Sequence, residues 1–463
     1  MIRIRKTLSL LIIILLAFQI NSYSQTGPGG VGNSTSNLVW LEADSLTGLS
    51  DGDDITTWSD GSGNALDFSQ PDPAYKPIYK ANILNSKPVV RIDKTNGRIR
   101  RTAFANFPTT AITTFVVNRN SDNNDAILSY ASTAGSNDFL IFNSSSLNFY
   151  RGTNVNSGIA INNNSWHIVD ASWRSSDGAI AFWIDGSESY TNTLQTGTSI
   201  TQDGCLAIAG EQDAIDGGYD AGQAHTGDFA EVIVYNTYLN DAQRIIVANY
   251  LAAKYNLDIS ASGNNYYSYE DDHGNDVAGI GREDATNTHT SAMSSGIMQI
   301  SNPSALDADN EYMFFGHDDD SISSWTTIEA PNSGTNIQRL AREWRFEETG
   351  DLGTLTFTID TTLLPARPSG YSKFVLLVDA DGDFSSGASI YEMLSPGTDE
   401  FFELPGYNIN SGDYVAIGAI VPTIEFSESD PEEFETTNGT LDIVLNYISQ
   451  SDVDVDYFTT DFT

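Results

Sequence analysis

Three aspartates at alternate positions, Asp379, Asp381 and Asp383, have the residue type and spacing best suited to metal chemistry in this chain. They follow a strongly apolar run, and hard oxygen ligands at such spacing suit calcium. The segment is not an EF-hand, because Gly382 comes too early and the twelfth position is Ile390. The sequence therefore predicts calcium as a cofactor at this loop. A hairpin turn built on Asp-Gly is the alternative.

Two glycine-containing segments match functional patterns but lack the context that those patterns need. Residues 27–32 match G-x-G-x-x-G, yet they precede any strand and no helix follows them. Residues 48–52 match G-x-S-x-G, in which Ser50 would be the nucleophile. A nucleophile elbow requires a following helix, and this chain continues as a β-like segment. We reject both matches.

The sequence also lacks the residue combinations that hydrolytic enzymes use. The five histidines are His167, His225, His273, His289 and His317. They are scattered and form no H-E-x-x-H pair. Glycosidases need two carboxylates about 5–9.5 Å apart, which alternate positions on one strand would supply. Glu231 lies in a strand-like run, but Ile233 and Tyr235 occupy its same-face positions. The sequence predicts no catalytic residues and no enzyme.

The elements that must position these side chains are predicted to be mostly β-strands. Short apolar runs alternate with turns of Asp, Gly, Asn and Ser, and Asp185-Gly186 after residues 180–184 predicts a hairpin. The predicted strands include Ile112–Asn118, Asp138–Asn143, His167–Trp173, Ala179–Ile184, Phe229–Tyr235, Glu311–Gly316, Leu355–Ile359, Lys373–Val378 and Asp413–Ala419. This pattern is typical of all-β sandwiches and jelly rolls.

One helix is predicted in this β protein. Asn240 can cap residues 241–256, with Asp241 near the positive end and Lys254 near the other. A broad apolar face predicts that the helix docks on an edge or face of a sandwich. Cys205 lies in a strand-like run and is expected to be a small core residue.

The N-terminus predicts export. Basic residues precede an apolar run that is too short to span a bilayer, and cleavage is expected between Ser24 and Gln25. Without residues 1–24, the chain has 19 basic against 62 acidic residues, a formal charge of −43. Such a surface repels nucleic acid and attracts divalent cations. We expect a secreted or cell-surface chain with no transmembrane segment after cleavage.

Composition shifts divide the chain into successive segments. Residues 1–24 are the signal peptide, 25–36 a Gly/Ser-rich flexible leader, and 37–258 the first β domain. A linker over 259–269 precedes a second β-rich domain over 270–421. Residues 422–463 begin a third β unit that has too few strands to close a core. The expectation is that the sequence is a truncated piece of a longer chain.

Several motifs resemble known families. Residues 38–44, 166–167 with 182–186, and 229–236 resemble the laminin G-like, concanavalin A-like lectin family over residues 37–258. Residues 277–284, 342–351 and 377–383 resemble a domain of unknown function that is common in bacterial surface proteins. Residues 453–461 resemble the start of a calcium-binding Calx-beta domain. The fold implied is a concanavalin A-like jelly-roll sandwich, a second β-sandwich-like domain and an incomplete third β unit.

These resemblances imply a binding or adhesion protein that recognises an extracellular glycan or surface protein through its laminin G-like domain. A structural spacer of a larger surface protein is one alternative. An accessory module of a polysaccharide-degrading enzyme is the other. The sequence identifies no ligand-binding residues.

Overall fold

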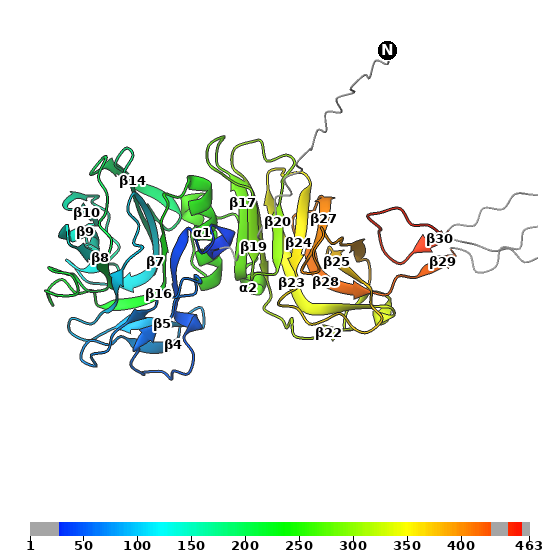
Figure 1. Ribbon diagram of the computed structural model, residues 1–463, viewed down its shortest axis with the longest axis horizontal. Coiled ribbons are helices and arrows are strands. Elements are labelled where there is room, and N and C mark those ends of the chain that lie inside the picture. The colour runs from blue at the N-terminus through cyan, green and yellow to red at the C-terminus, as the bar shows by residue number, and fades with distance from the viewer. Residues whose placement is uncertain (1–26, 427–442, 456–463) are drawn as a thin grey trace, which may run out of the picture.

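The computed structural model describes residues 27–426 and 443–455. The predicted signal peptide and cleavage site lie outside these ranges. The described part is nearly all β, as predicted, and is organised around two sandwiches (Figure 1). None of its helices is long and apolar enough to cross a membrane.

The first sandwich contains two eight-stranded antiparallel sheets. One is built from β1 (Asn37–Glu42), β4 (Ile78–Leu84), β5 (Lys87–Ile92), β7 (Ala111–Asn120), β12 (His167–Arg174), β13 (Ala179–Ile184), β14 (Ser187–Thr193) and β16 (Gly227–Tyr235). Its order is β14-β13-β12-β7-β16-β5-β4, with β1 also paired to β16. The hairpin predicted at Asp185-Gly186 joins β13 to β14.

The opposing sheet completes the first core. Its strands are β2 (Thr57–Trp58), β3 (Phe68–Ser69), β6 (Ile99–Phe104), β8 (Ala126–Ser132), β9 (Gly135–Phe142), β10 (Asn148–Arg151), β11 (Thr153–Asn156) and β15 (Gly204–Ile208). Their order is β11-β10-β9-β8-β15-β6-β3-β2. Trp58 and Trp173 lie fully buried between the sheets, and Cys205 is buried as predicted.

The second sandwich pairs a large sheet with a small one. The large sheet contains β17 (Asn275–Arg282), β18 (Thr288–His289), β21 (Glu311–His317), β22 (Trp325–Thr326), β23 (Ile337–Thr349), β25 (Lys373–Asp379), β26 (Ser389–Glu392) and β28 (Tyr414–Ile420). The small sheet contains β19 (Ser291–Ser294), β20 (Met298–Ser301), β24 (Leu355–Asp360) and β27 (Phe401–Tyr407). Trp344 and Phe357 lie in the core shared by the two sheets.

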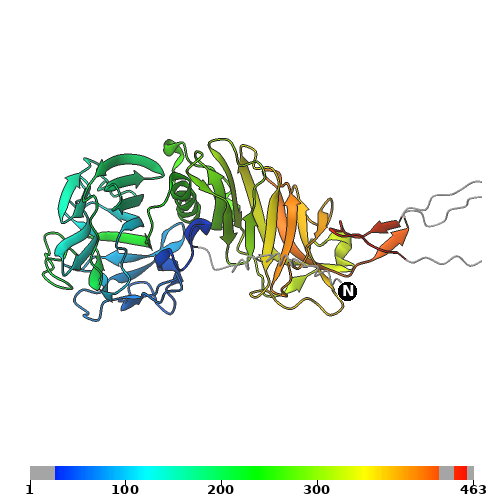
Figure 2. The same ribbon diagram turned by 45° about the horizontal axis from the view of Figure 1, so that its top comes forward.

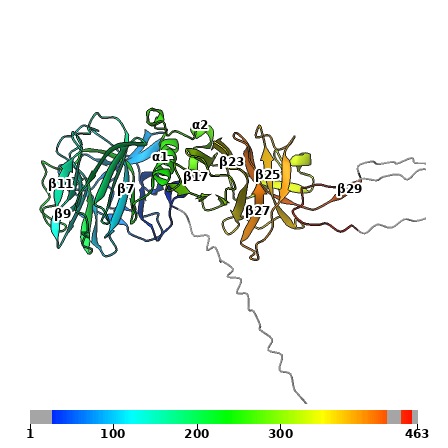
Figure 3. The same ribbon diagram turned by 90° about the horizontal axis from the view of Figure 1, so that it is seen from above.

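Helix α1 (Asp241–Tyr255) lies between the two sandwiches, in all three views (Figures 1, 2 and 3). Asn240 caps it in a capping box with Gln243, so the predicted helix start is confirmed. Thirteen of its fifteen residues are buried, which a helix docked on one side only would not achieve. One apolar cluster joins Phe115 and Ile233 of the first sandwich, the helix, and Phe314 of the second sandwich.

The segments predicted as a leader and a linker are packed parts of this junction. The 3₁₀ turn η1 (Pro28–Gly30) is buried, so the expectation of a flexible leader is wrong for these residues. Gly30 has φ of +77°, and a Cβ there would lie 2.6 Å from the Cβ of Ala292. Close approach, rather than flexibility, is therefore the reason for glycine at this position. In the predicted linker, Tyr267 is buried and Tyr266 stacks on Tyr312.

Short elements complete the described chain. They are η2 (Ala43–Ser45), η3 (Ser260–Ser262), α2 (Glu270–His273), η4 (Pro331–Gly334), β29 (Ile424–Phe426) and β30 (Ile443–Leu445). Tyr447, just after β30, is buried against an apolar cluster on the outer face of β25 and β28. No strand forms at 453–455, and residues 456–463, the end of the predicted third β unit, lie outside the described residues.

Candidate functional site

The loop that joins β15 to β16 carries an acidic group held in place by a buried amide. Gln212 is fully buried, and its Nε2 donates to the carbonyl oxygens of Ser129 and Cys205 at 2.8 and 3.0 Å. Its Oε1 accepts a hydrogen bond from the backbone N–H of Asp216. The amide of Gln212 thus anchors the segment that carries Glu211 and Asp213 to β8 and β15.

Glu211 is the chemically unusual residue of this loop. Its side chain is 4% exposed, and Oε2 has no hydrogen-bond partner. Burial, and then the charges of Asp213 and Asp220, raise the pKa of Glu211 to about 7. A buried carboxylate without a cationic partner is costly, whereas a bound cation would relieve both the burial and the repulsion.

The rest of the loop leaves Asp213 and Asp220 exposed beside Glu211. Asp216 is already paired, because it forms an ion pair with Arg100 and accepts a hydrogen bond from Tyr219. The three remaining carboxylates, from Glu211, Asp213 and Asp220, supply the oxygen type that calcium prefers, but their oxygens do not all lie within 4.8 Å of one another in this structure. Oδ1 of Asp220 also accepts from the N–H of Gly222. We missed this group in the sequence, although four acids within residues 211–220 around Gly217-Gly218 were a usable signal.

The predicted calcium loop is folded on its own backbone. Oδ1 of Asp379 accepts from the N–H groups of Asp381 and Gly382, and Oδ1 of Asp381 accepts from that of Asp383. Asp383 in turn accepts from the N–H and hydroxyl of Ser385. These are successive Asx turns, which the aspartates form without a metal. Calcium at this loop stays a prediction.

A buried charge cluster of Lys254, Glu42, Asp44 and Glu231 lies where α1 packs on the first sandwich. Nζ of Lys254 lies 2.6 Å from Oε1 of Glu42, 2.9 Å from Oε2 of Glu231 and 3.2 Å from Oδ1 of Asp44. Burial opposes the charge on Lys254, but Glu231 and Glu42 outweigh it and hold its pKa well above the usual value. Burial raises the pKa of Glu42 to about 7 despite Lys254.

This cluster corrects the expectation that Glu231 has no carboxylate partner. Glu42 on β1 lies directly opposite Glu231 on β16, so the pair forms across two strands rather than along one. Glu231 is almost completely buried and also accepts from Trp40 Nε1, Tyr250 OH and Tyr255 OH, at 2.8, 3.0 and 2.8 Å. A carboxylate so fully bonded is held for structure, not presented to a substrate.

A pocket of about 270 Å³ lies between the two sandwiches, and Glu42 of this cluster is one of its lining residues. Trp40, Glu42 and Tyr250 line it from the first sandwich, and Asp276 and Met293 from the second. Its volume lies just below the range of about 300–1,000 Å³ that is typical of small-molecule sites. We treat it as a cavity of the junction rather than as the main binding site.

Two sequence matches identify relatives of the two halves. Residues 103–266 match the Pentaxin family. Residues 243–413 match a domain of unknown function, DUF8202. The first match confirms the expected lectin-like fold at the coarser level, whereas the laminin G-like and Calx-beta assignments stay resemblances. The two matched ranges overlap over 243–266, which contains most of the helix that both sandwiches bury.

Curated relatives cover a part of the first half. C-reactive protein of Mus musculus is 32% identical over 122 residues, which are 26% of this chain and 54% of that protein. C-reactive protein 1.4 of Limulus polyphemus is 34% identical over 80 residues, 17% of this chain and 33% of that protein. The chain thus spans about half the length, or less, of these relatives.

Among solved structures, a heptameric SAP-like pentraxin from Limulus polyphemus is 22% identical, with a TM-score of 0.29. The alignment covers 33% of this chain and 74% of that chain. Domain 4 of an arabinanase from Geobacillus stearothermophilus is 13% identical, with a TM-score of 0.34, over 46% of this chain and 98% of that chain.

Proposed function

We propose that this chain is an exported binding protein whose first sandwich recognises an extracellular glycan or surface protein through calcium. Glu211, Asp213 and Asp220 would hold the ion. Bound calcium would supply positive charge and free coordination positions to oxygen atoms of a ligand. The observation that carries the proposal is the buried, unpartnered Oε2 of Glu211, beside two carboxylates that raise its pKa.

Charge and similarity support the same reading. The loop lies within residues 103–266, the range that matches the Pentaxin family. The excess of acidic residues in the full chain draws divalent cations toward the surface. Export rests on the sequence of residues 1–24.

The absence of enzymatic activity is also part of the proposal. A glycosidase would need a pair of carboxylates, and Glu42 and Glu231 are neighbouring carboxylates that both contact Lys254 Nζ, at 2.6 and 2.9 Å. The single ammonium of Lys254 contacts both carboxylates, and Glu231 is almost completely buried. A role as spacer or accessory module has no comparable observation in its favour.

Retention on glycan and protein arrays tests the proposal. We expect binding in millimolar calcium that is lost with chelator and reduced more than about tenfold by Glu211→Gln, because an acidic ligand is removed. Asp177→Asn is the matched control, since Asp177 is an exposed acid paired with Arg174 on a distant hairpin. Binding that survives chelation would contradict the calcium mechanism, and absence of any retained ligand would favour the spacer.

A further inference from the structure

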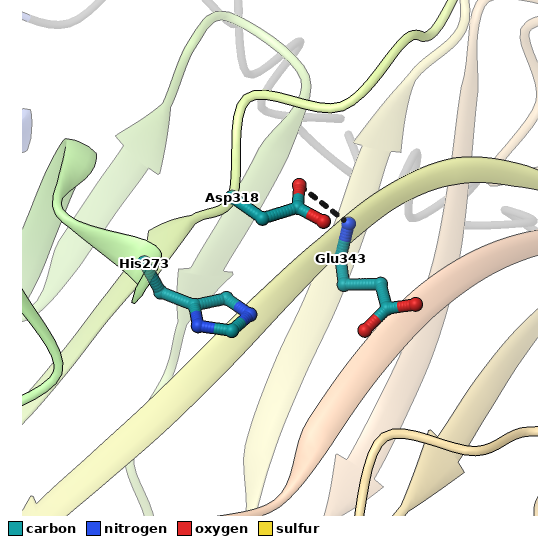
Figure 4. A group of neighbouring side chains, drawn as sticks. All are labelled: His273, Asp318 and Glu343. Atoms are coloured by element: carbon teal, nitrogen blue, oxygen red, sulfur yellow. Dashed lines mark hydrogen bonds between the residues drawn. The ribbon is translucent and has the colours of Figure 1, made fainter. Parts of the chain in front are cut away.

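A second, different group of potential metal ligands lies in the second sandwich. His273 ends α2, Asp318 directly follows β21, and Glu343 lies on β23 (Figure 4). Each offers one ligand atom, and these three atoms all lie within 4.8 Å of one another. Among the described residues, no other group of three or more His, Cys, Asp and Glu side chains meets this spacing.

His273 is a buried histidine whose ring nitrogens have no hydrogen-bond partner, which is the state expected of an unoccupied metal ligand. Its side chain is 6% exposed, and neither ring nitrogen has a hydrogen-bond partner. A neutral imidazole offers one nitrogen lone pair to a metal, and no protein group occupies either nitrogen of this ring. Figure 4 shows the ring directed toward the two carboxylates.

The other four histidines do not share this feature. Each has at least one ring nitrogen bonded to protein: His167 to Asp185 and Asn163, His225 to Asp125 and Asn120, His289 to the carbonyl of Gly30, and His317 to Asp276 and the N–H of Asp319. Buried polar groups are normally satisfied in this way. The unbonded ring of His273 is therefore a specific feature of this site.

One oxygen of each carboxylate is bonded to protein donors. Oδ1 of Asp318 accepts from the N–H groups of Glu343 and Asp320, at 3.2 and 3.0 Å. Oε1 of Glu343 lies 2.8 Å from Nη1 of Arg339, while burial raises the pKa of Glu343 to about 7. Such outer contacts orient carboxylates that ligate a metal.

We propose that His273, Asp318 and Glu343 bind a divalent transition-metal ion, of which Zn²⁺ fits best. One imidazole nitrogen with two carboxylate oxygens is a donor set that zinc accepts, whereas calcium and magnesium take oxygen ligands. Three protein ligands leave a fourth position open to water or to a ligand. This site is independent of the calcium proposal, because it lies in the other sandwich and uses different chemistry.

The ion would also stabilise the junction between the sandwiches, because it would link α2 to β21 and β23. His273 belongs to the segment that leads from α1 into the second sandwich, while Asp318 follows β21 and Glu343 lies on β23 of that sandwich. Binding only to the folded chain stabilises it. Asp318 thus takes part in a long-range group, because His273 and Glu343 are 45 and 25 residues away in sequence.

Titration of the chain without a polyhistidine tag tests this site, in millimolar calcium and magnesium that saturate general acidic sites. We expect one equivalent of Zn²⁺ to bind and to raise the Tm. Co²⁺ used as a probe should give the visible absorption of a nitrogen- and oxygen-ligated ion. His273→Gln and Asp318→Asn should each weaken binding more than about tenfold.

Asp272→Asn is the matched control, since it removes an exposed acid from the same short helix and should leave Zn²⁺ affinity unchanged. If His273→Gln fails to fold, NMR of the histidine rings in the unaltered chain decides, because Zn²⁺ must shift the His273 resonances first. Unchanged affinity in the two ligand variants, or a first shift at another histidine, would overturn the proposal.

Discussion

Replacing Lys254 with methionine should lower the free energy of unfolding by about 3–5 kcal/mol, because it leaves buried carboxylates without their cation. Methionine preserves most of the apolar part of the lysine side chain. The decrease in the free energy of unfolding therefore measures the effect of removing the positive charge. Glu42, Asp44 and Glu231 all contact Lys254 Nζ, and Glu231 is almost completely buried. Chemical denaturation at pH 7.5 measures the change.

The pH dependence of this variant has a defined sign. Carboxyl groups whose folded-state pKa is raised favour folding below their unfolded pKa and lose that contribution as pH rises through the folded value. Glu42 already has a pKa of about 7 with Lys254 present, and removing the cation raises it further. The Lys254→Met variant should therefore recover stability as pH falls from 7.5 toward 5.

The surface pair of Lys80 with Asp51, at 2.7 Å, provides the matched control. Lys80→Met should lower the free energy of unfolding far less than Lys254→Met, because water and salt screen an exposed pair. Similar losses in the two variants would mean that the buried cluster does not hold the junction.

Separating the sandwiches should destabilise the first one strongly. A fragment of residues 27–258 exposes the side of α1 and η1 that packs on β17 and β19 in the whole chain. Val277, Tyr312 and Phe314 would be missing from the shared cluster. Burial of each such side chain contributes about 1.5–3 kcal/mol, so the loss is on the order of 5 kcal/mol.

For a domain of this size, that loss corresponds to a decrease in Tm of roughly 10–20 °C. Calorimetry and dye binding to exposed apolar surface would measure it against residues 27–421. The sequence alone suggested that the first domain folds independently with a helix on its surface. A fragment that melts within a few degrees of the longer chain, and binds no dye, would restore that view.

Local patterns were sufficient for most strands and for the helix. Alternating apolar residues predicted β13 at its observed bounds, Ala179–Ile184. Asn240 and the apolar positions after it predicted α1 almost to the residue. The all-β class followed from the same periodicity, because side chains of a strand alternate between two faces.

Long-range contacts were out of reach of such patterns. Glu42 and Glu231 become neighbours only through the pairing of strands 189 residues apart, which no local spacing reveals. Buried glycines at residues 29 and 30 looked like a flexible leader, although they allow close packing. The apolar residues of α1 indicated one docking face, whereas the second partner appears later in the chain.

The same limit applies to the candidate sites. Alternating aspartates at 379–383 predicted ligands, yet their carboxylates accept hydrogen bonds from their own loop. Glu211 is buried and has a carboxylate oxygen without a hydrogen-bond partner, and both features depend on the packing of the loop against β8 and β15. Local charge patterns therefore identified acidic loops but could not show that Glu211 has an unpartnered carboxylate oxygen.

Calcium titration by calorimetry tests the central claim most directly, with three chains compared at constant ionic strength. The account predicts binding at a Kd of about 10⁻⁴–10⁻³ M, weakened more than about tenfold by Glu211→Gln. A chain in which Asp379, Asp381 and Asp383 are all changed to Asn should keep the binding that depends on Glu211, because calcium at that loop would be a separate site. Loss of calcium binding in that triple variant, with full affinity retained in Glu211→Gln, would contradict the account.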